Sequence, residues 1–380
     1  MTKENYQICS ELVVDSTYPN ISFDANGVSN IYNNFNENVI KYWQTGDEGQ
    51  KKLEVMIKKL KHDGQGRDFD CLIGLSGGLD SSYMLHKVVK EFGLRPLVFH
   101  VDGGWNSELA VHNINVLVDK LGLDLYTEVI NWQEMRDFQL AMFKSGVPHL
   151  DIPQDHAFIS VLYKFARRHN IKYILNGGNI ASESVELPLE FFYWGTDLVQ
   201  IRDILSKFGS VEMKSYPFSS IWYHKCYLNY IRGIKVFKPL NSMPFVQADA
   251  IRTLQLEYDW KPYSQKHFES RFTRFFEGYW LFTRFGLDVR RAQFSSLILS
   301  GQMTRDEALN RLEKLPYDQY LIDQDFDYIA TKLGISEEEL NKLLTSPKKF
   351  YWDYRNHHKL FNVGEWVLSR IAGTTRGGAW

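Results

Sequence analysis

The sequence predicts an α/β protein built on a doubly wound parallel sheet, followed by a helical, aromatic-rich C-terminal region. Short apolar segments at residues 71–75, 96–101, 124–130 and 172–175 alternate with amphipathic segments, as strands and helices do in such a sheet. Turn-forming residues follow three of them, at 76–82, 102–106 and 176–179. Because the carboxyl ends of parallel strands meet at one edge, we expect these three turns to converge on one ligand site.

The other elements follow from periodicity and capping signals. Residues 1–35 are rich in turn formers, and residues 36–64 carry a helical apolar face. Further helices are predicted at 79–92, 107–121 and 157–169. In the last third, Thr304 with Glu307 and Ser336 with Glu339 mark two helix starts. We therefore expect three parts: an N-terminal lobe and helix (1–64), an α/β domain (65–185), and a mostly helical region that meets a substrate or partner (186–380).

Composition restricts the classes of function. The 380 residues are 44% hydrophobic, and the net charge is −2, which argues against a nucleic-acid partner. No apolar run is long enough to span a bilayer, and the N-terminal residues lack the apolar core of a signal peptide. Three cysteines, Cys9, Cys71 and Cys226, do not form a disulfide framework. A cytoplasmic location is the simplest expectation.

The first turn has the properties of an anion site. A buried strand leads into Ser76-Gly77-Gly78, and the next helix begins at Leu79-Asp80-Ser81-Ser82. Amide groups of the turn and of the first helical turn point at one spot, where the helix dipole adds partial positive charge. Glycine lets the backbone approach a phosphate closely. The carboxylate of Asp80 is suited to hold Mg²⁺ beside that phosphate. The alternative is a glycine-rich turn without a ligand.

The pattern S-G-G-x-D-S lacks the Gly-Lys-Ser/Thr of a Walker A loop. It resembles the PP-loop of the ATP pyrophosphatase class, which includes asparagine, GMP and NAD synthetases and tRNA thiolases. The resemblance implies cleavage of ATP between the α- and β-phosphates. It also implies that residues 76–82 hold pyrophosphate and magnesium. Two further groups would complete the nucleotide site: His100, Val101 and Asp102 facing adenosine, and Gly177, Gly178 and Asn179 lining the side of the α-phosphate.

Four longer segments narrow the resemblance: HVDGGWNSELA (100–110), LNGGNIASES (175–184), KHFESRFTRFFEGYW (266–280) and RRAQFSSLILSGQMTRDEAL (290–309). They are similar to the N-acetyl sugar amidotransferase family of the WbpG and PseA type, which acts in bacterial lipopolysaccharide O-antigen and related surface-polysaccharide synthesis. The resemblance implies that ATP adenylates the acetamido oxygen of an activated N-acetyl sugar, and that ammonia then replaces AMP to leave an acetamidino group. Two acceptors stay open, a UDP-linked diacetamido uronic acid and a nonulosonic acid precursor.

The basic stretch 261–291 has seven lysines and arginines against three acidic residues. By itself it fits a phosphorylated substrate and a solvated helix face equally well. The resemblance makes Lys266 and His267 catalytic candidates beside Asp80 and Ser76. The candidates for sugar-nucleotide or pyrophosphate contacts are Arg271, Arg274, Arg290 and Arg291. A general-base role for His267 is weighed against a structural, hydrogen-bonded histidine, which is favoured.

Two family features are changed or absent. Where many members carry a C-x-x-C…C-x-x-C zinc motif, this chain has Cys9, Leu12, Ser29 and Tyr32, so we expect no structural zinc. We expect that lobe to be held by apolar packing instead. We also find no glutaminase nucleophile, so ammonia should come from a separate glutaminase subunit that works with a cyclase-like barrel protein.

Two other functions were weighed. A PP-loop tRNA sulfurtransferase would use a reactive cysteine to carry sulfur, but Cys71 and Cys226 lie in apolar settings typical of core thiols. Another adenylating synthetase stays an alternative. A non-catalytic nucleotide-binding scaffold would tolerate substitutions at the motif positions of the loop, yet every one of these positions matches the pattern. The amidotransferase is therefore the preferred hypothesis.

Overall fold

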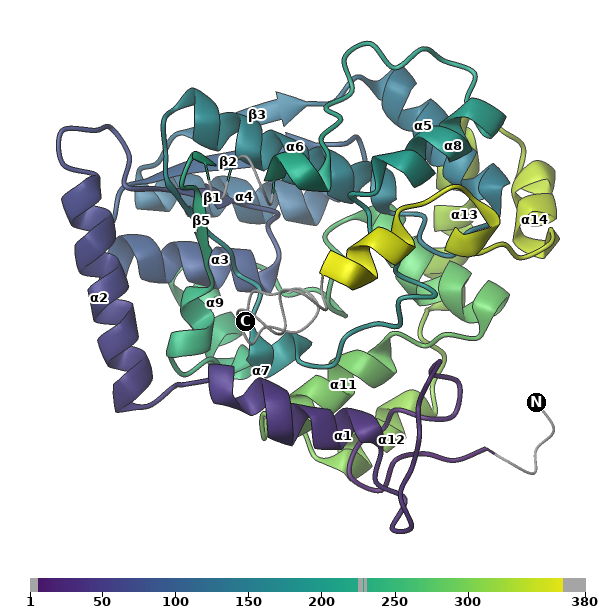
Figure 1. The fold of residues 1–380 in the computed structure, drawn as a ribbon, viewed down its shortest axis with the longest axis horizontal. Helices are drawn as coiled ribbons and strands as arrows, with labels where there is room; N and C mark the ends of the chain where they lie inside the picture. Colours follow the sequence, from purple (N-terminus) through teal and green to yellow (C-terminus); the bar gives the residue numbers. More distant parts are fainter. Residues whose placement is uncertain (1–5, 225–227, 229–230, 365–380) are drawn as a thin grey trace.

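The computed structural model describes residues 6–224, 228 and 231–364 (Figure 1). Its centre is a parallel sheet in the order β3-β2-β1-β4-β5. The strands are β1 (Cys71–Gly74), β2 (Pro96–Asp102), β3 (Leu125–Val129), β4 (Tyr173–Leu175) and β5 (Lys235–Phe237). The first four match the four predicted apolar segments, so the α/β class and the parallel sheet are confirmed.

Helices cover both faces of the sheet, as in a doubly wound fold (Figure 1). On one face, Leu72 of β1 and Phe99 of β2 pack with Val161 and Phe165 of α6 (Ile152–Arg168). On the other face, Ile73 packs among residues of α3, α4 and α9. These three helices are α3 (Leu79–His86), α4 (Glu108–Leu121) and α9 (Gln247–Tyr258). β1, β2 and β4 are buried over most of their length and read as apolar runs, whereas the edge strand β3 is largely exposed.

The fifth strand was not predicted from the sequence, and it lies within the mostly helical region after residue 185. β5 pairs in parallel with β4, placing Lys235 beside Tyr173 and Phe237 beside Leu175. Three residues are too few to show a strand period. The region after residue 185 therefore extends the sheet, although most of it is helical. The three-part division of the chain stays a prediction.

The remaining helices frame the sheet and its carboxyl edge. Before the sheet come α1 (Asn30–Asn34), a π-helical turn (Phe35–Val39), a 3₁₀ turn (Ile40–Tyr42) and α2 (Asp47–Asp63); the predicted helix 36–64 is thus broken before Asp47. A second π-helical turn (Lys87–Glu91) prolongs α3. The sequence analysis missed α5 (Trp132–Ser145), whose start is capped by the Asn131 side chain. Two short helices, α7 (Ile180–Glu183) and α8 (Leu198–Phe208), follow β4.

The C-terminal half supplies further helices. They are α10 (Arg271–Thr273), a π-helix (Arg274–Phe285), α11 (Arg290–Leu299), α12 (Arg305–Leu312), α13 (Gln319–Leu333) and α14 (Glu337–Thr345), with 3₁₀ turns at Pro239–Ser242 and Tyr351–Asp353. Thr304 and Ser336 cap α12 and α14 as predicted, each accepting a bond from the amide three residues on. Among the described residues, every helix is too short or too polar to span a bilayer.

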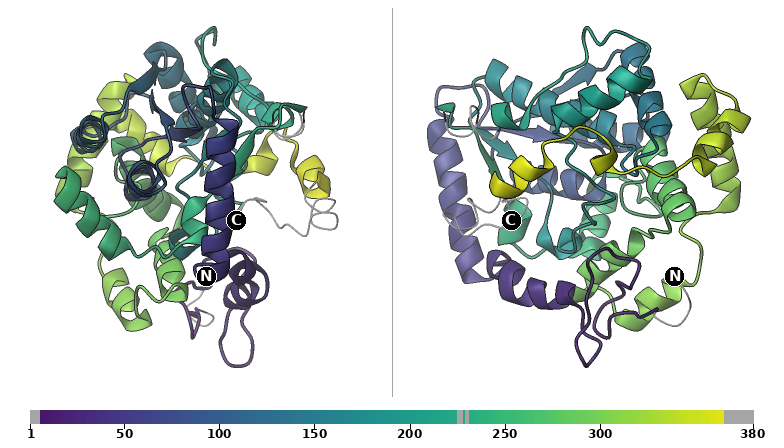
Figure 2. Two further views of the ribbon diagram at one scale, coloured as in Figure 1. Left: turned by 90° about the vertical axis from the view of Figure 1, so that its left-hand side faces the viewer. Right: turned by 45° about the vertical axis from the view of Figure 1, so that its right-hand side comes forward.

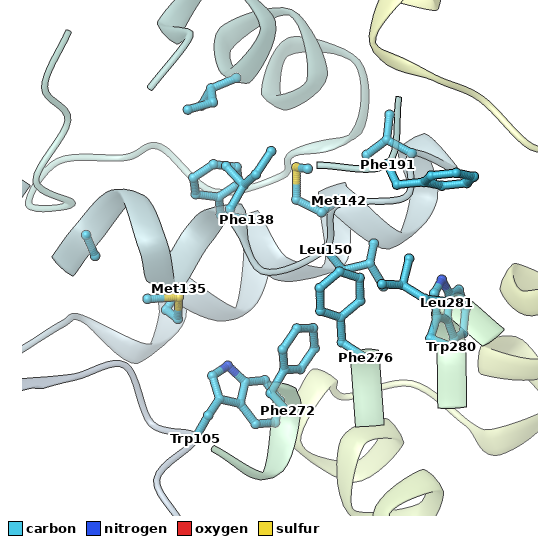
Figure 3. Packing of buried hydrophobic residues seen from close by; sticks show 14 of the residues in the cluster. Trp105, Met135, Phe138, Met142, Leu150, Phe191, Phe272, Phe276, Trp280 and Leu281 are labelled. Atoms are coloured by element: carbon cyan, nitrogen blue, oxygen red, sulfur yellow. The ribbon is translucent and has the colours of Figure 1, made fainter. Parts of the chain in front are cut away.

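Buried aromatic side chains join the C-terminal half to the α/β core (Figure 3). Phe272, Phe276 and Trp280 recur every four residues along α10 and the π-helix and face residues of α5. Trp280 meets Phe143 of α5 edge to face, with the ring centroids 4.8 Å apart. Side chains four residues apart lie on one side of a helix, so the three rings form a single stripe. This packing fixes the segment beginning at Lys266 over the sheet edge.

The N-terminal lobe lies beside α11 and α12, far away in sequence (Figure 2). Leu12 and Val14 are fully buried, and Ile21, Phe23 and Tyr32 pack against the same core, which confirms the expected apolar packing. The Ser29 amide donates to Cys9 Sγ at 3.3 Å, so two of the four positions compared with the zinc motif lie in contact. Arg305 adds a polar clamp by donating to the carbonyls of Cys9 (2.9 Å) and Leu12 (3.0 Å).

We predict that Arg305→Ala lowers the free energy of unfolding by about 2 kcal/mol, because charge-assisted bonds to two buried carbonyls are lost. Urea denaturation of the full chain measures this. Arg311→Ala is the matched control, since Arg311 forms only an exposed pair with Glu307 one helical turn away. Equal losses for the two variants would show that Arg305 does not clamp the lobe.

Candidate active site

The first predicted turn forms a tightly held loop between β1 and α3. Gly77 has φ +83°, and a Cβ there would lie 2.8 Å from the Ala110 carbonyl oxygen, so only glycine fits. Ser76 Oγ accepts from the Gly78 amide at 3.2 Å and lies 3.2 Å from Ser81 Oγ. From outside, Trp260 Nε1 and Tyr263 OH each donate to the Gly77 carbonyl at 3.1 Å. The loop conformation is therefore set before any ligand binds.

The turn at 176–179 lies directly against the loop at 76–82. A Cβ on Gly177 would come within 2.9 Å of the Asp80 carbonyl carbon and oxygen and 3.0 Å of the Ser81 nitrogen. Asn179 caps α7 by accepting from the Ser182 amide at 3.0 Å. The two glycine turns thus meet backbone to backbone at the sheet edge, as the sequence predicted from the carboxyl ends of β1 and β4.

Lys266 connects these turns from the C-terminal half. Its Nζ lies 3.0 Å from Asp80 Oδ2, 2.8 Å from Glu183 Oε1 and 2.9 Å from Ser182 Oγ. Burial would lower the pKa of Lys266, but Asp80 and Glu183 outweigh it and raise the pKa, so the ammonium stays charged. Burial raises the pKa of Asp80, and the attraction of Lys266 offsets only part of this effect. The ammonium of Lys266 is therefore shared by two carboxylates, and it offsets only part of the negative charge of Asp80.

A cavity of about 200 Å³ opens over the two turns. The site residues predicted from the sequence that line this cavity are Ser76, Gly78, Asp80, Ser81, Gly177, Gly178, Lys266 and His267. The other predicted loop residues support it from behind or beside: Leu79 lines a neighbouring cavity, and Gly77, Ser82 and Asn179 shape the backbone. The structure thus brings most of the predicted nucleotide residues to one place.

The turn at 102–106 faces an adjoining cavity of about 490 Å³. This cavity and the cavity over the loop share four lining residues: Ser76, Phe158, His267 and Glu269. His100 and Val101 line the cavity of about 490 Å³. His100 bridges the turns, with Nδ1 2.8 Å from the Leu75 carbonyl and Nε2 2.8 Å from Asn106 Nδ2. Asp102 instead shapes its own turn by accepting from the Gly104 amide at 2.8 Å.

The four predicted substrate arginines bind protein carboxylates in this structure. Arg271 and Arg274 both contact the fully buried Asp325, at 2.9 and 2.7 Å. Arg290 binds Asp288 at 2.6 Å, and Arg291 binds Asp15 at 2.9 Å. Arg290 also lines a cavity beside Lys266. Each guanidinium is paired with a buried carboxylate in this structure, and the contacts of these arginines with a sugar nucleotide or pyrophosphate stay a prediction.

His267 is held as a cation rather than as a base. Its backbone has φ +66°, a strained value for a residue with a side chain. Nδ1 lies 3.1 Å from Glu277 Oε1. Burial would lower the pKa of His267, but the Glu277 carboxylate outweighs it and raises the pKa to about 9. The pairing with Glu277 therefore favours a structural, hydrogen-bonded histidine over a general base, and a catalytic role for His267 stays a prediction.

This pairing predicts a pH dependence. Because the folded pKa of His267 lies above the ordinary 6.5, the pair contributes stability that is complete below pH 6.5 and is lost as pH rises through about 9. Glu277→Gln should lower the pKa of His267, read from its imidazole NMR signals, and flatten the stability profile in that window. Glu307→Gln, which removes an exposed carboxylate, is the control. An unchanged His267 titration in Glu277→Gln would contradict the assignment.

Several site residues were not predicted. Glu183 and Glu269 each lie within a segment used for the resemblance, and their position in those motifs was the signal that could have drawn attention to them. Glu269 Oε1 lies 3.3 Å from Ser76 Oγ, and burial raises the pKa of Glu269. The sequence around Trp260 and Tyr263 did not indicate that these side chains contact the loop. Their bonds to the Gly77 carbonyl depend on where α9 lies relative to the loop.

The carboxylates that line the loop cavity fit a site for magnesium. Asp80, Glu183 and Glu269 surround a loop shaped for anions, so a bound triphosphate would meet like charge unless a divalent cation lay between. Within the described residues, Asp80 Oδ1 is buried without a hydrogen-bond partner. No group of three or more acidic, histidine or cysteine side chains in that part of the chain forms a metal cage. Mg²⁺ typically uses one or two carboxylates and completes its coordination with phosphate oxygens, so it fits here.

Comparison with known proteins gives one family match. Residues 269–368 match the family model described as LPS biosynthesis protein WbpG-like, C-terminal domain, which confirms the WbpG-type resemblance over that region. The matched region begins at Glu269, the residue that contacts Ser76 of the loop. A search of curated proteins found no match.

Solved structures of synthetases also align with the chain. NMN synthetase from Francisella tularensis is 14% identical, with a TM-score of 0.37, over 76% of this chain and 97% of that one. NH3-dependent NAD synthetase from Campylobacter jejuni subsp. jejuni NCTC 11168, in complex with the nitrate ion, is 15% identical, with a TM-score of 0.32, over 79% and 98%.

Proposed function

We propose that this chain is an ATP-dependent, AMP-forming amidotransferase that converts an N-acetyl group on an activated sugar into an acetamidino group. One observation carries the proposal: Glu269, where the WbpG-like region begins, contacts Ser76 of the S-G-G-x-D-S loop. The Ser107 amide also donates to the Glu269 carbonyl at 3.0 Å. The region that resembles WbpG therefore helps to build the nucleotide cavity itself.

The proposed reaction balances in two steps. The acetamido oxygen attacks the α-phosphorus of ATP, and pyrophosphate leaves. Ammonia then attacks the activated carbon, and AMP leaves with the former amide oxygen, giving the amidine. An amide oxygen is a poor leaving group, and adenylation turns it into a good one. No protein nucleophile is required, so positioning and charge stabilisation are the main tasks.

The residues divide these tasks. The loop amides and Ser76 and Ser81 would hold pyrophosphate. Asp80 would hold Mg²⁺, whose chemistry is to neutralise phosphate charge. Lys266, kept charged between Asp80 and Glu183, would stabilise negative charge that develops as pyrophosphate leaves. Ammonia would come from a glutaminase subunit with a cyclase-like barrel protein, and the reaction would take place in the cytoplasm during surface-polysaccharide synthesis.

Sulfur transfer is less well supported. Cys71 is fully buried in β1, and burial raises the pKa of its thiol, so it is a poor nucleophile. Cys9 is also fully buried. Cys226 lies outside the described residues.

Product analysis tests the proposal. The full chain is incubated with ATP, magnesium, ammonium and a panel of UDP- and CMP-activated N-acetyl sugars. We expect equal amounts of AMP, pyrophosphate and a sugar in which NH replaces the amide oxygen, detected by chromatography and mass spectrometry. Formation of ADP and phosphate would exclude the mechanism. Amidine formation from glutamine without an added glutaminase would contradict the expected partner.

A further inference from the structure

We propose that His267 binds the α-phosphate of ATP through its Nε2–H group, as a cation that weakens the repulsion between this phosphate and an incoming acetamido oxygen. The inference rests on the proposed function, which assigns the loop to pyrophosphate and Asp80 to Mg²⁺ but no cation to the α-phosphate. It also gives His267 a role that differs from both the general base and the purely structural histidine weighed from the sequence.

His267 lies where the adenosine and the pyrophosphate of a bound ATP would meet. The resemblance places pyrophosphate on the loop and adenosine beside His100 and Val101, which line the cavity of about 490 Å³. That cavity and the loop cavity have a shared wall, and the α-phosphate has to lie at this wall because it joins adenosine to pyrophosphate. The wall consists of Ser76, Phe158, His267 and Glu269, of which only His267 is basic.

The ring of His267 has one nitrogen available to a ligand. Nδ1 lies 3.1 Å from Glu277 Oε1 and 3.3 Å from Glu277 Oε2, so this carboxylate fixes the orientation of the ring and keeps a proton on Nδ1. Within the described part of the chain, Nε2 forms no hydrogen bond. The His267 side chain is 41% exposed, so a phosphate oxygen at the shared wall can reach Nε2.

The charges around the shared wall make His267 the cation for the α-phosphate. Lys266, which also lines the loop cavity, is already shared by Asp80 and Glu183, at 3.0 and 2.8 Å. The carboxylate partner of His267 outweighs burial and raises the pKa of the ring to about 9, so Nε2–H carries charge at neutral pH and suits a charge-assisted hydrogen bond to phosphate. Burial raises the pKa of Glu269, which favours the neutral acid and lessens its repulsion of a phosphate.

The backbone that follows His267 is bonded to the turn at 102–106 and the residue after it. The Ser107 amide donates to the Glu269 carbonyl, and the Arg271 amide donates to the Trp105 carbonyl, both at 3.0 Å. His267 itself has φ +66°, a value that costs energy for a residue with a side chain. Such strain persists only where the surrounding structure imposes it, and it is concentrated at ligand sites. The backbone geometry therefore supports a ligand-binding role for His267.

Binding of AMP and of adenosine to the full chain tests the contact, because the two ligands differ only in the α-phosphate. Isothermal titration calorimetry in a magnesium buffer measures both dissociation constants. His267→Gln keeps a side-chain N–H but removes the charge, so it should weaken AMP binding about tenfold and leave adenosine binding unchanged. His62→Gln is the matched control, since His62 lies 3.0 Å from the Asp63 carboxylate but is 80% exposed on α2, and it should bind both ligands as the wild type does.

Imidazole NMR of the wild type adds a measurement that needs no change at His267. The His267 signals are assigned through their shift in Glu277→Gln. We expect the Nε2 signal to shift when AMP is added and to stay in place when adenosine is added, because only AMP carries the phosphate that this nitrogen contacts. A histidine with a purely structural role would respond to the two ligands alike.

Three results would overturn the contact: equal weakening of AMP and adenosine binding in His267→Gln, unchanged AMP binding in that variant, or an Nε2 signal that ignores AMP. Thermal unfolding confirms that each variant is folded. The outcome is separable from that of the proposed function. The expected AMP results without amidine formation would refute the reaction alone, whereas amidine formation at the wild-type rate in His267→Gln would refute the contact alone. Absence of AMP binding to the wild type would refute the contact together with the nucleotide site.

Discussion

Asp80→Ala should reduce AMP formation by on the order of a hundredfold or more, because it removes the preorganised carboxylate that we propose holds magnesium against the phosphates. Asp80 is the loop carboxylate at the start of α3, and its buried Oδ1 is without a partner among the described residues. The fold should persist, since Lys266 keeps its 2.8 Å contact with Glu183. Without Asp80, the ammonium of Lys266 is still paired with the Glu183 carboxylate, so the substitution leaves no buried charge without a partner.

Steady-state AMP release and a melting curve measure the two effects together. Asp80→Asn separates charge from shape, because it keeps the side-chain volume, and it should lose as much activity as Asp80→Ala. Asp119→Asn removes an exposed carboxylate on α4 and should behave as the wild type. Activity of Asp80→Ala within threefold of the wild type, with an unchanged melting temperature, would refute the role of Asp80.

Gly177→Ala should cost nearly as much activity by a purely steric route. The added Cβ would lie 2.9 Å from the Asp80 carbonyl carbon and oxygen, which are backbone atoms and cannot rotate away. The two turns must therefore separate, and a displacement of about 1 Å at a catalytic site can cost on the order of a hundredfold. Overpacking should also lower the free energy of unfolding by about 1–3 kcal/mol.

Gly195→Ala is the matched control, because its Cβ would meet its nearest neighbour, Ile152 Cγ1, at an ordinary 3.8 Å. Activity and urea denaturation are compared for both variants. If Gly177→Ala retained full activity, the close contact of the two turns would not matter for catalysis.

The local sequence was enough to predict the central α/β architecture and the loop. A buried apolar run, a glycine turn and a helix start are encoded by neighbouring residues, so β1, the Ser76–Ser82 loop and α3 follow from a single short segment. The convergence of the turns followed from the geometry of parallel strands, and the structure places Gly177 against Asp80. The WbpG-type resemblance likewise rested on contiguous motifs, one of which lies within the matched region from residue 269.

Only the tertiary structure decided the partners of the charged residues. Arg271 and Asp325 are 54 residues apart, and Lys266 and Asp80 are 186 apart. A cation's sequence neighbours do not reveal whether a buried carboxylate or a ligand will neutralise it, so the sequence did not predict the pairing of the arginines with carboxylates or the contact of Lys266 with Glu183. The same holds for β5, whose three residues become a strand only because β4 offers an open edge. The cavity of about 490 Å³ is likewise assembled from α6, the turn at 102–106 and the π-helix, and no single segment encodes it.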